Sequence, residues 1–245
     1  MRLQFATWPD IQEYLERCDA VLIPIGSTEQ HGPTGLIGTD AICPEHLAGG
    51  MAEQGVLVAP TLSIGMAQHH LRFPGSITLR PTTLIAVIRD VVASLVSQGF
   101  RRFLFLNGHG GNVATVQAAF AELYADASLG GQESGIVLEL FNWYLGPRVG
   151  KLSRELFGDA EGSHATPSEV SLTWHAYPEA ARQQSLEPRI APKGPIRDAA
   201  DYRKHFPDGR IGSDPTLASV EHGARLYAAG LADAMERWEA LLGAA

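Results

Sequence analysis

The residues of this chain with the clearest chemical potential lie in short runs of metal-ligand types. The first run, Gly26–Pro33, carries Glu29 and His31, and Asp40 follows soon after it. Glu29 and His31 are separated by one residue, so both side chains point to the same side of an extended segment. A carboxylate can bridge two cations, and mixed His, Asp and Glu ligation suits Zn²⁺, Mn²⁺ or Fe²⁺. These residues predict a metal site, although Asp40 could also serve only as a helix cap.

A second run, Asn107–Asn112, contains His109 between glycines. Gly110 and Gly111 would let the backbone approach a metal or a substrate closely, and their N–H groups at a helix start could hold an anionic oxygen. Taken alone, a histidine beside glycine is more often structural than a ligand, and Asn112 can be a simple helix cap. The position of this run directly after an apolar segment favours a role in the same metal site.

A third run adds His164 and Glu169. His164 is a plausible proton carrier because the ordinary pKa of histidine is about 6.5. Glu169 lies three residues after Thr166, the spacing of a capping box, so it is either a functional carboxylate or a cap. Outside these runs, His70 could line a substrate cleft. Trp143 could form a substrate wall, and packing in the core or at an interface is an equal alternative.

These runs follow segments with the patterns of an alternating α/β protein. Apolar runs predict strands at Val21–Ile25, Val56–Leu62, Arg102–Leu106 and Ile136–Asn142. Helical patterns cover Trp8–Cys18, Ala41–Gln54, Thr82–Gln98, Val113–Ala127, Ser168–Ala176 and Thr216–Leu242. Strands separated by helices indicate a mostly parallel sheet covered on both faces, with the ligand runs just past strand ends. No boundary divides residues 1–245, so we expect a single domain.

The segment Gln183–Pro215 differs from the rest of the chain. It contains five prolines and several charges but no periodic pattern that we assign to an element. Loops of this length in compact domains are usually functional or disordered. We expect an excursion over the surface that acts as a lid or as a contact between subunits, followed by the last helix with Ser213 or Asp214 as its cap.

The composition narrows the classes of function. The 245 residues carry a net charge of −8 and are 45% hydrophobic. An acidic chain is disfavoured as a partner of nucleic acid or of an anionic membrane, because both require basic patches. Two cysteines do not form a disulfide framework, and no apolar run approaches the roughly 20 residues of a membrane helix. We therefore expect a cytoplasmic protein.

Together these motifs resemble those of the creatininase (creatinine amidohydrolase) family, and the resemblance extends over most of the chain. The resemblance implies a three-layer α/β/α fold, a centre of two divalent metal ions and assembly into homo-oligomers, often hexamers. Members hydrolyse amide bonds of creatinine, of a formylamino-pyrimidine nucleotide and of a redox-cofactor precursor peptide. The motifs that carry it are Gly26–Pro33, Gly38–Asp40, His70 with Phe73–Leu79, Asn107–Asn112, His164–Ser171 and Ile211–Pro215.

The resemblance also implies roles for single residues. By position, Glu29 and His109 would hold one metal and His31 the other, with Asp40 bridging. Glu169 would complete the second metal site, and His164 would be the catalytic histidine.

The chain departs from the family pattern at several positions. Gly111 stands where creatininase itself has a metal-binding glutamate, which leaves Glu169 for that seat and makes creatinine a doubtful substrate. Thr34 replaces a second histidine of many members, and Thr166 with Pro167 replaces a usual Gly-Glu pair. The metals should survive these changes, whereas the substrate can differ.

The sequence thus predicts a metal-dependent amidohydrolase that cleaves a non-peptide C–N amide bond, cyclic or linear, of a small molecule. Two cations would share a hydroxide that attacks the amide carbon, while the Gly110–Gly111 backbone or a metal holds the developing oxyanion. His164 would protonate the leaving nitrogen. The glycine-rich helix start leaves a metal-dependent phosphoesterase as one alternative, and a non-catalytic binding protein on the same fold is another.

Overall fold

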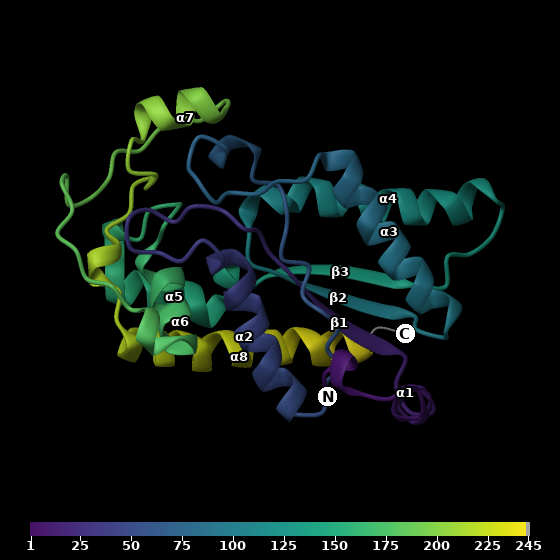
Figure 1. Ribbon diagram of the computed structural model, residues 1–245. Coiled ribbons are helices and arrows are strands. Elements are labelled where there is room, and N and C mark those ends of the chain that lie inside the picture. Colours follow the sequence, from purple (N-terminus) through teal and green to yellow (C-terminus); the bar gives the residue numbers. More distant parts are fainter. Residues whose placement is uncertain (244–245) are drawn as a thin grey trace.

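Three apolar runs form the central sheet of the protein. In the computed structural model, which describes residues 1–243, β1 (Ala20–Ile25), β2 (Arg102–Asn107) and β3 (Val137–Asn142) lie side by side in that order (Figure 1). Both pairs are parallel and in full register, so that Ile25, Asn107 and Asn142 end at one edge. Parallel pairing requires a crossover after each strand, and helices supply it.

Helices cover both faces of this sheet, as expected of a three-layer α/β/α protein. Figure 1 shows α3 and α4 on one side of the strands and α2 and α8 on the other. The helices are α1 (Trp8–Leu15), α2 (Thr39–Glu53), α3 (Pro81–Ser97), α4 (Val113–Leu129), α5 (Pro147–Phe157), α6 (Pro167–Ala176), α7 (Ala199–His205) and α8 (Val220–Gly243). Short 3₁₀ turns lie at Leu3–Phe5, Gln68–His70, Gly110–Asn112, Trp143–Leu145, Gly158–Ala160, Pro178–Ala180 and Pro215–Leu217.

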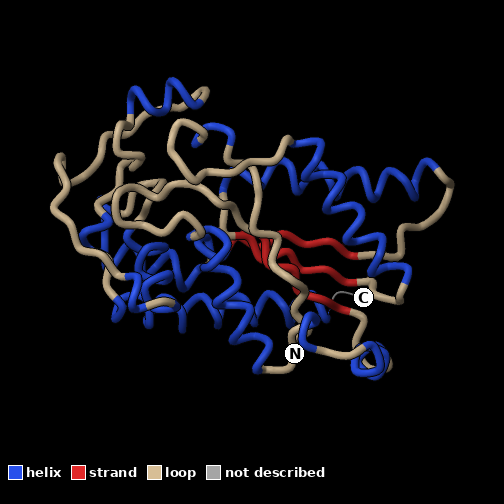
Figure 2. Tube along the Cα trace, in the orientation of Figure 1, coloured by secondary structure: helices blue, strands red, loops and turns tan. Residues whose placement is uncertain are grey.

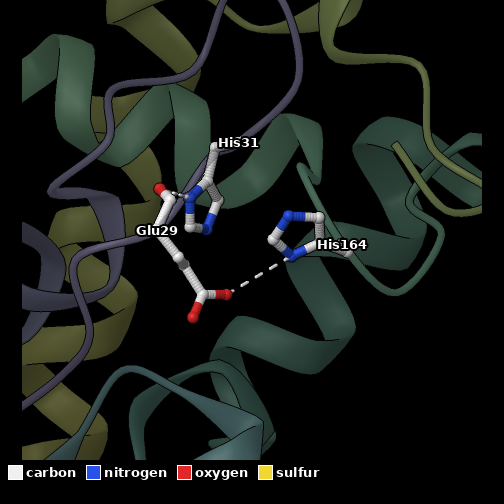
Figure 3. Close-up of side chains that lie close together, drawn as sticks. All are labelled: Glu29, His31 and His164. Atoms are coloured by element: carbon white, nitrogen blue, oxygen red, sulfur yellow. Dashed lines mark hydrogen bonds and ion pairs between the residues drawn. The ribbon is translucent and has the colours of Figure 1, made fainter. Parts of the chain in front are cut away.

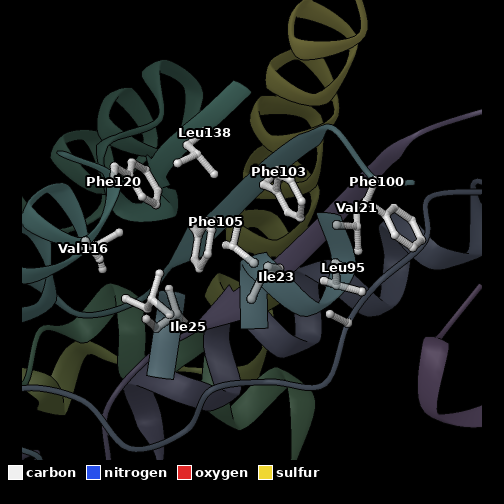
Figure 4. Packing of buried hydrophobic residues seen from close by; sticks show 14 of the residues in the cluster. Val21, Ile23, Ile25, Leu95, Phe100, Phe103, Phe105, Val116, Phe120 and Leu138 are labelled. Atoms are coloured by element: carbon white, nitrogen blue, oxygen red, sulfur yellow. The ribbon is translucent and has the colours of Figure 1, made fainter. Parts of the chain in front are cut away.

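Alternate residues of each strand enter two separate hydrophobic clusters. Ile23 and Phe105 pack with side chains of α3 and α4 on one face (Figure 4), whereas Leu22 and Leu104 pack with α2 and α8 on the other. A strand that is buried on both faces needs apolar residues at nearly every position, which explains why β1 and β2 do not alternate with polar residues. The edge strand β3 is mostly half-buried and includes Glu139. The two clusters hold the strand ends, and hence the loops that follow them, in fixed positions.

The predicted strand Val56–Leu62 is wrong as a regular strand. The segment runs parallel beside β1 but touches it only through isolated bridges, at Val58 with Leu22 and at Leu62 with Ile25. The ladder is interrupted at Pro24 of β1, because proline has no N–H to donate to the neighbouring segment.

The helices follow the predictions with three exceptions. The helix α5, with Pro147 in its first turn, and the short helix α7 inside the 183–215 segment were not predicted. The last helix begins at Val220 rather than Thr216, after a 3₁₀ turn. Asp214 caps that turn by accepting from the Thr216 N–H, and Ser219 Oγ accepts the N–H of His222 in the first turn of α8. The predicted cap of the last helix is therefore wrong.

Long loops gather at the carboxyl edge of the sheet, on the left in Figure 2. They include the ligand runs after β1 and β2 and the 183–215 segment, which carries α7. No helix of residues 1–243 has the length and apolar character needed to cross a membrane.

Candidate metal centre

Two buried carboxylates face one imidazole at the carboxyl edge of the sheet. Glu29 comes from the loop after β1, Asp40 from the first turn of α2, and His109 from the loop after β2. His109 lies between them, with Nδ1 2.9 Å from Asp40 Oδ2 and Nε2 3.2 Å from Glu29 Oε2. Neighbouring parallel strands end at the same edge, so the two loops bring these residues together without help from distant segments.

Asp40 joins this group to a second one. Its Oδ1 lies 3.1 Å from Nε2 of His31, and the same Nε2 is 3.8 Å from Oε1 of Glu169. The other nitrogen of His31, Nδ1, donates to the backbone oxygen of Glu29, which fixes the ring. Two sets of potential ligand atoms, Glu29–Asp40–His109 and His31–Asp40–Glu169, therefore share one aspartate.

Buried oxygens in this cluster lack hydrogen bonds. Glu29 Oε1 and Asp40 Oδ2 have no hydrogen-bond partner among the described residues, although each lies 2.9 Å from an imidazole nitrogen, of His70 and His109 respectively. The distances are short but the angles are not those of hydrogen bonds. Atoms that face a common centre rather than one another have this arrangement, and an unpaired buried carboxylate oxygen is costly. The residues therefore fit a cation.

The charges of the cluster also call for a cation. Three carboxylates lie here, and within residues 1–243 their only ion-pair partners are histidines. Burial raises the pKa of Glu29 and of Glu169 to about 7. Although burial alone would raise the pKa of Asp40, His31 and His109 hold it well below its usual range. Despite burial, the carboxylates raise the pKa of His109 to about 9. Divalent metals displace such protons from their ligands when they bind.

Asp40 and Glu169 could each have been a helix cap, and the structure shows a cap only for Glu169. Gly38, not Asp40, is the N-cap of α2, so the Asp40 carboxylate is not used as a cap. Glu169 does belong to a capping box: its Oε1 accepts from the Thr166 N–H at 2.6 Å, and its own N–H donates to Thr166 Oγ1. Glu169 caps α6 and faces His31 at the same time.

His164 approaches the cluster from the loop before α6. Figure 3 shows its ring pointing toward Glu29, with Nδ1 3.9 Å from Glu29 Oε1. Its Nε2 lies 2.8 Å from the backbone oxygen of Gln30, which can only accept, so Nε2 carries the proton and Nδ1 faces the carboxylate. Burial, reinforced by His31 and His70, holds the pKa of His164 well below its usual range. With Glu29 and His31, His164 forms a third possible ligand set.

The Gln30 side chain links this histidine to its surroundings. Its Oε1 accepts from the Gly32 N–H, and its amide nitrogen lies 3.0 Å from both Nδ1 of His70 and the Gly209 carbonyl oxygen. The amide nitrogen is also 3.1 Å from the Tyr202 hydroxyl, so three acceptors share its two hydrogens. Because Nε2 of His164 already carries the proton that faces the Gln30 carbonyl oxygen, its 2.9 Å approach to the amide nitrogen is a contact between two donors.

A cavity of about 690 Å³ opens above the cluster, within the size range of small-molecule sites. His70, Gly110 and Gly111 line it as predicted residues of the substrate region. A Cβ on Gly111 would lie 2.4 Å from Nε2 of His109, so this glycine leaves room for the His109 ring. The tyrosine Tyr144 also lines the cavity, and its hydroxyl lies close above Gly110.

Trp143 has a different position from the one predicted. Its side chain is 1% exposed and packs in the cluster beneath α2 and α8, so it does not form a wall of the cavity. The 3₁₀ turn that follows β3 directs successive side chains in different directions, which places Tyr144 in the cavity and Trp143 in the core.

The sequence analysis did not identify two residues of the site, Gln30 and Tyr202, which contact His70 and His164. Gln30 lies within the first ligand run, and its position between Glu29 and His31 was a usable signal. Tyr202, on α7, packs its ring against His70, and its hydroxyl donates to the Gly209 oxygen. The i, i+4 spacing of Tyr202 and Phe206 could have indicated the short helix, but not the contact of its tyrosine with a distant histidine.

Comparison with known proteins identifies the family. The sequence profile of the family described as creatinine amidohydrolase matches residues 4–238. The chain belongs to the creatininase family. It is 31% identical over 225 residues to the 3-dehydro-scyllo-inosose hydrolase of Thermotoga maritima, covering 86% of this chain and 70% of that protein. It is 30% identical over 232 residues to the mycofactocin precursor peptide peptidase of Mycolicibacterium smegmatis, covering 89% and 85%.

Solved creatininase structures share the fold. A manganese form superimposes with a TM-score of 0.82 at 21% identity, and a two-zinc form of a variant with 0.83 at 21% identity, each covering 96% of both chains. The creatinine amidohydrolase of Pseudomonas putida is 30% identical over 186 residues, covering 71% of this chain and 70% of that protein. Creatininase-family members are metal-dependent amidohydrolases, and this chain is a hydrolase of that class.

Proposed function

We propose that this creatininase-family hydrolase cleaves the amide C–N bond of a small molecule at a centre of two divalent cations, zinc or manganese. Glu29 and His109 hold one cation, His31 and Glu169 hold the other, and Asp40 belongs to both seats. The observation that carries the proposal is the shared aspartate: one carboxylate faces His31 through Oδ1 and His109 through Oδ2. A carboxylate that turns one oxygen toward each of two ligand sets suits a pair of adjacent cations better than a lone metal.

Bound cations supply Lewis acidity for the amide carbonyl and lower the pKa of water. The protein's own groups orient the reaction. Ser27 donates to Glu29 Oε2 at 2.8 Å, which orients the carboxylate, while Oε1 has no hydrogen bond among the described residues and lies beside the His70 ring. Such partners of metal ligands keep the ligand in one orientation, and their loss usually weakens metal binding about 10- to 100-fold.

His164 is the proton carrier in this proposal. Its Nδ1 bears the lone pair and faces the cluster, while Nε2 is anchored on the Gln30 carbonyl oxygen. An imidazole in this position can take a proton from attacking water and return it to the leaving nitrogen. Gly110, Gly111 and the Tyr144 hydroxyl form the wall on which the amide lies, with backbone N–H groups available for the carbonyl oxygen.

The cellular setting of the protein is part of the proposal. Cys18 and Cys43 are both free, which suits the reducing cytoplasm. The family resemblance supports a homo-oligomer such as a hexamer. Exposed isoleucines in the loops beside the site, Ile37, Ile64 and Ile77, supply apolar surface for such contacts. Light scattering of the purified protein tests this assembly, and a monomer at micromolar concentration would contradict it.

The decisive experiment is a substrate screen with metal-loaded and chelated protein. The panel contains formamides, cyclic amides and short peptides, together with phosphate monoesters and diesters. We expect the metal-loaded protein to release an amine or ammonia from at least one amide. After chelation, the release should fall to the background rate. Phosphate release without amide cleavage would establish the phosphoesterase instead. Binding of substrates without any turnover would establish the non-catalytic protein.

A further inference from the structure

One wall of the cavity is formed by α5. It differs chemically from the floor of the cavity, which is formed by Glu29, Asp40 and His109. Gly150, Ser153 and Arg154 line the cavity on this helix. Among the described residues that line the cavity, Arg154 is the one lysine or arginine, whereas Glu29, Asp40, Glu161 and Glu169 are all acidic. The cavity therefore has a single fixed positive side chain on a wall separate from the acidic floor.

The Arg154 guanidinium has no protein carboxylate to neutralise it. Within residues 1–243, no ion pair includes Arg154. Two other charged residues of α5 are paired: Arg148 binds Asp233 at 2.8 Å and Glu236 at 2.6 Å, and Glu155 binds Arg225 at 2.9 Å. Lys151 has no ion pair among the described residues either, but it does not line the cavity. The helix thus uses its other arginine for structure and leaves Arg154 free.

Glu161 is the acidic side chain that could compete for this arginine. It lines the same cavity, but its Oε1 accepts from the Ser168 hydroxyl, and no ion pair joins it to Arg154. The guanidinium lies beside Gly150 on the helix surface: a Cβ at that position would be in ordinary contact with Nη1 of Arg154, at 3.6 Å. The guanidinium therefore lies over the glycine surface of the helix, open to whatever occupies the cavity.

We propose that Arg154 binds an anionic group of the substrate, a carboxylate or a phosphate, and that the amide hydrolysed here is an anionic one. This inference rests on the proposed function and names its substrate class. Arginine presents a planar fork that matches both anions with paired hydrogen bonds, which also fixes the orientation of the bound group. Anchoring the substrate at α5 would set the distance of its amide from the floor, as catalysis by positioning requires.

The test uses probes that bind without knowledge of the natural substrate. Alkyl hydroxamates chelate metals, and ω-carboxyalkyl and ω-phosphonoalkyl hydroxamates with two to six methylenes add an anion at a variable distance. Calorimetry on metal-loaded protein measures each Kd. At one chain length we expect an anionic probe to bind about 5- to 10-fold more tightly than its uncharged partner. The preferred anion, carboxylate or phosphonate, identifies the source of the charge.

Variants assign that preference to one side chain. Arg154→Gln should abolish the anionic advantage, and Arg154→Lys should keep part of it. Lys151→Gln removes the same charge from the same helix, at an exposed position outside the cavity lining, and should leave the advantage unchanged. An advantage that survives in Arg154→Gln, or that falls equally in Lys151→Gln, overturns the proposal.

A second measurement follows the arginine itself rather than the affinity of the probe. Phenylglyoxal labels accessible arginines, and peptide mass spectrometry quantifies each site. An anionic probe should protect Arg154 and not the exposed Arg182, which lies outside the cavity, while the uncharged probe should protect neither. Equal labelling of Arg154 with both probes overturns the anion site. Failure of the uncharged hydroxamate to distinguish loaded from chelated protein would instead overturn the metal centre, so the two proposals fail separately.

Discussion

The floor and the roof of the cavity are built in different ways. The floor consists of Glu29, Asp40 and His109, which come from loops and a helix start beside neighbouring strand ends. The roof consists of His164 and Tyr202 with parts of the 183–215 segment, brought over the floor by contacts between residues far apart in the sequence. We therefore expect the floor residues to determine metal binding and the roof residues to determine the reaction rate. Substitutions in the two regions should change different measured properties.

Long-range hydrogen bonds hold the roof down. Arg210 is fully buried, pairs with Asp208 and donates to the carbonyl oxygens of Pro188, Arg189 and Ser213. Ser213 Oγ in turn donates to the His164 carbonyl oxygen at 2.6 Å. Gly194, Pro195 and Ile196 of the same segment line the cavity. These contacts support the prediction that the 183–215 segment covers the site.

Removal of the metals should have the largest effect, because it empties the floor. Chelation is expected to reduce amide hydrolysis to the background rate, and Zn²⁺ or Mn²⁺ should restore it. The thermal midpoint should also fall, since a cation present at 100 times its Kd stabilises the folded state by about 2.7 kcal/mol. Activity assays and calorimetric melting check both results. Full activity at a metal content below a tenth of an equivalent would contradict the account.

Replacement of His164 should affect the rate and not the metals. In His164→Asn the rate is expected to fall about 10²- to 10⁴-fold, the usual contribution of general acid–base catalysis. The loss should shrink for amides with better leaving groups. His222→Asn is the matched control, because His222 lies on α8 near the Leu217 carbonyl oxygen and outside the cavity. Loss of a metal from His164→Asn would make His164 a ligand, as its position beside Glu29 and His31 permits.

A pair of variants separates the two roles of Glu169. Glu169→Gln keeps a side chain that suits the N3 position of a capping box, so stability should change little. Metal affinity at one seat should nevertheless fall at least about tenfold. Thr166→Ala is the reciprocal change: it removes the cap, at a cost of about 0.5–2 kcal/mol, but leaves the carboxylate and both metals. Equal metal binding in the two variants would show that Glu169 is only a cap.

The smallest expected effect belongs to the Tyr202 hydroxyl. Tyr202→Phe removes its hydrogen bonds with Gln30 and Gly209 and should cost about 0.5–1.5 kcal/mol of stability with a few-fold lower rate. Tyr14→Phe is the matched control, because its buried hydroxyl donates to the Ala20 oxygen in the sheet layer. It should cost similar stability and leave the rate unchanged. Identical rates in both variants would mean that the roof does not adjust the reaction.

The floor could be predicted from the sequence because its signals are local. Glu29, His31 and His109 each follow an apolar run, and two such runs became adjacent parallel strands. The roof could not be predicted in the same way. Nothing near Tyr202 in the sequence indicates a contact with Gln30, and Trp143 and Tyr144 cannot be assigned to core and cavity without the turn that separates them. The prediction of a regular strand at Val56–Leu62 is wrong because the effect of Pro24 depends on which neighbour its missing N–H would have faced.

The most direct test of whether Asp40 is shared by two cations is the metal content of the wild-type protein and of Asp40→Asn, measured by elemental mass spectrometry after equilibration with Zn²⁺. We expect about two equivalents of Zn²⁺ per chain in the wild type and at most about one in Asp40→Asn, because the asparagine amide lacks the negative charge that two cations would share. Asp233→Asn, which alters a buried aspartate that binds Arg148, should retain both. Two tightly held equivalents in Asp40→Asn would contradict the shared-aspartate centre.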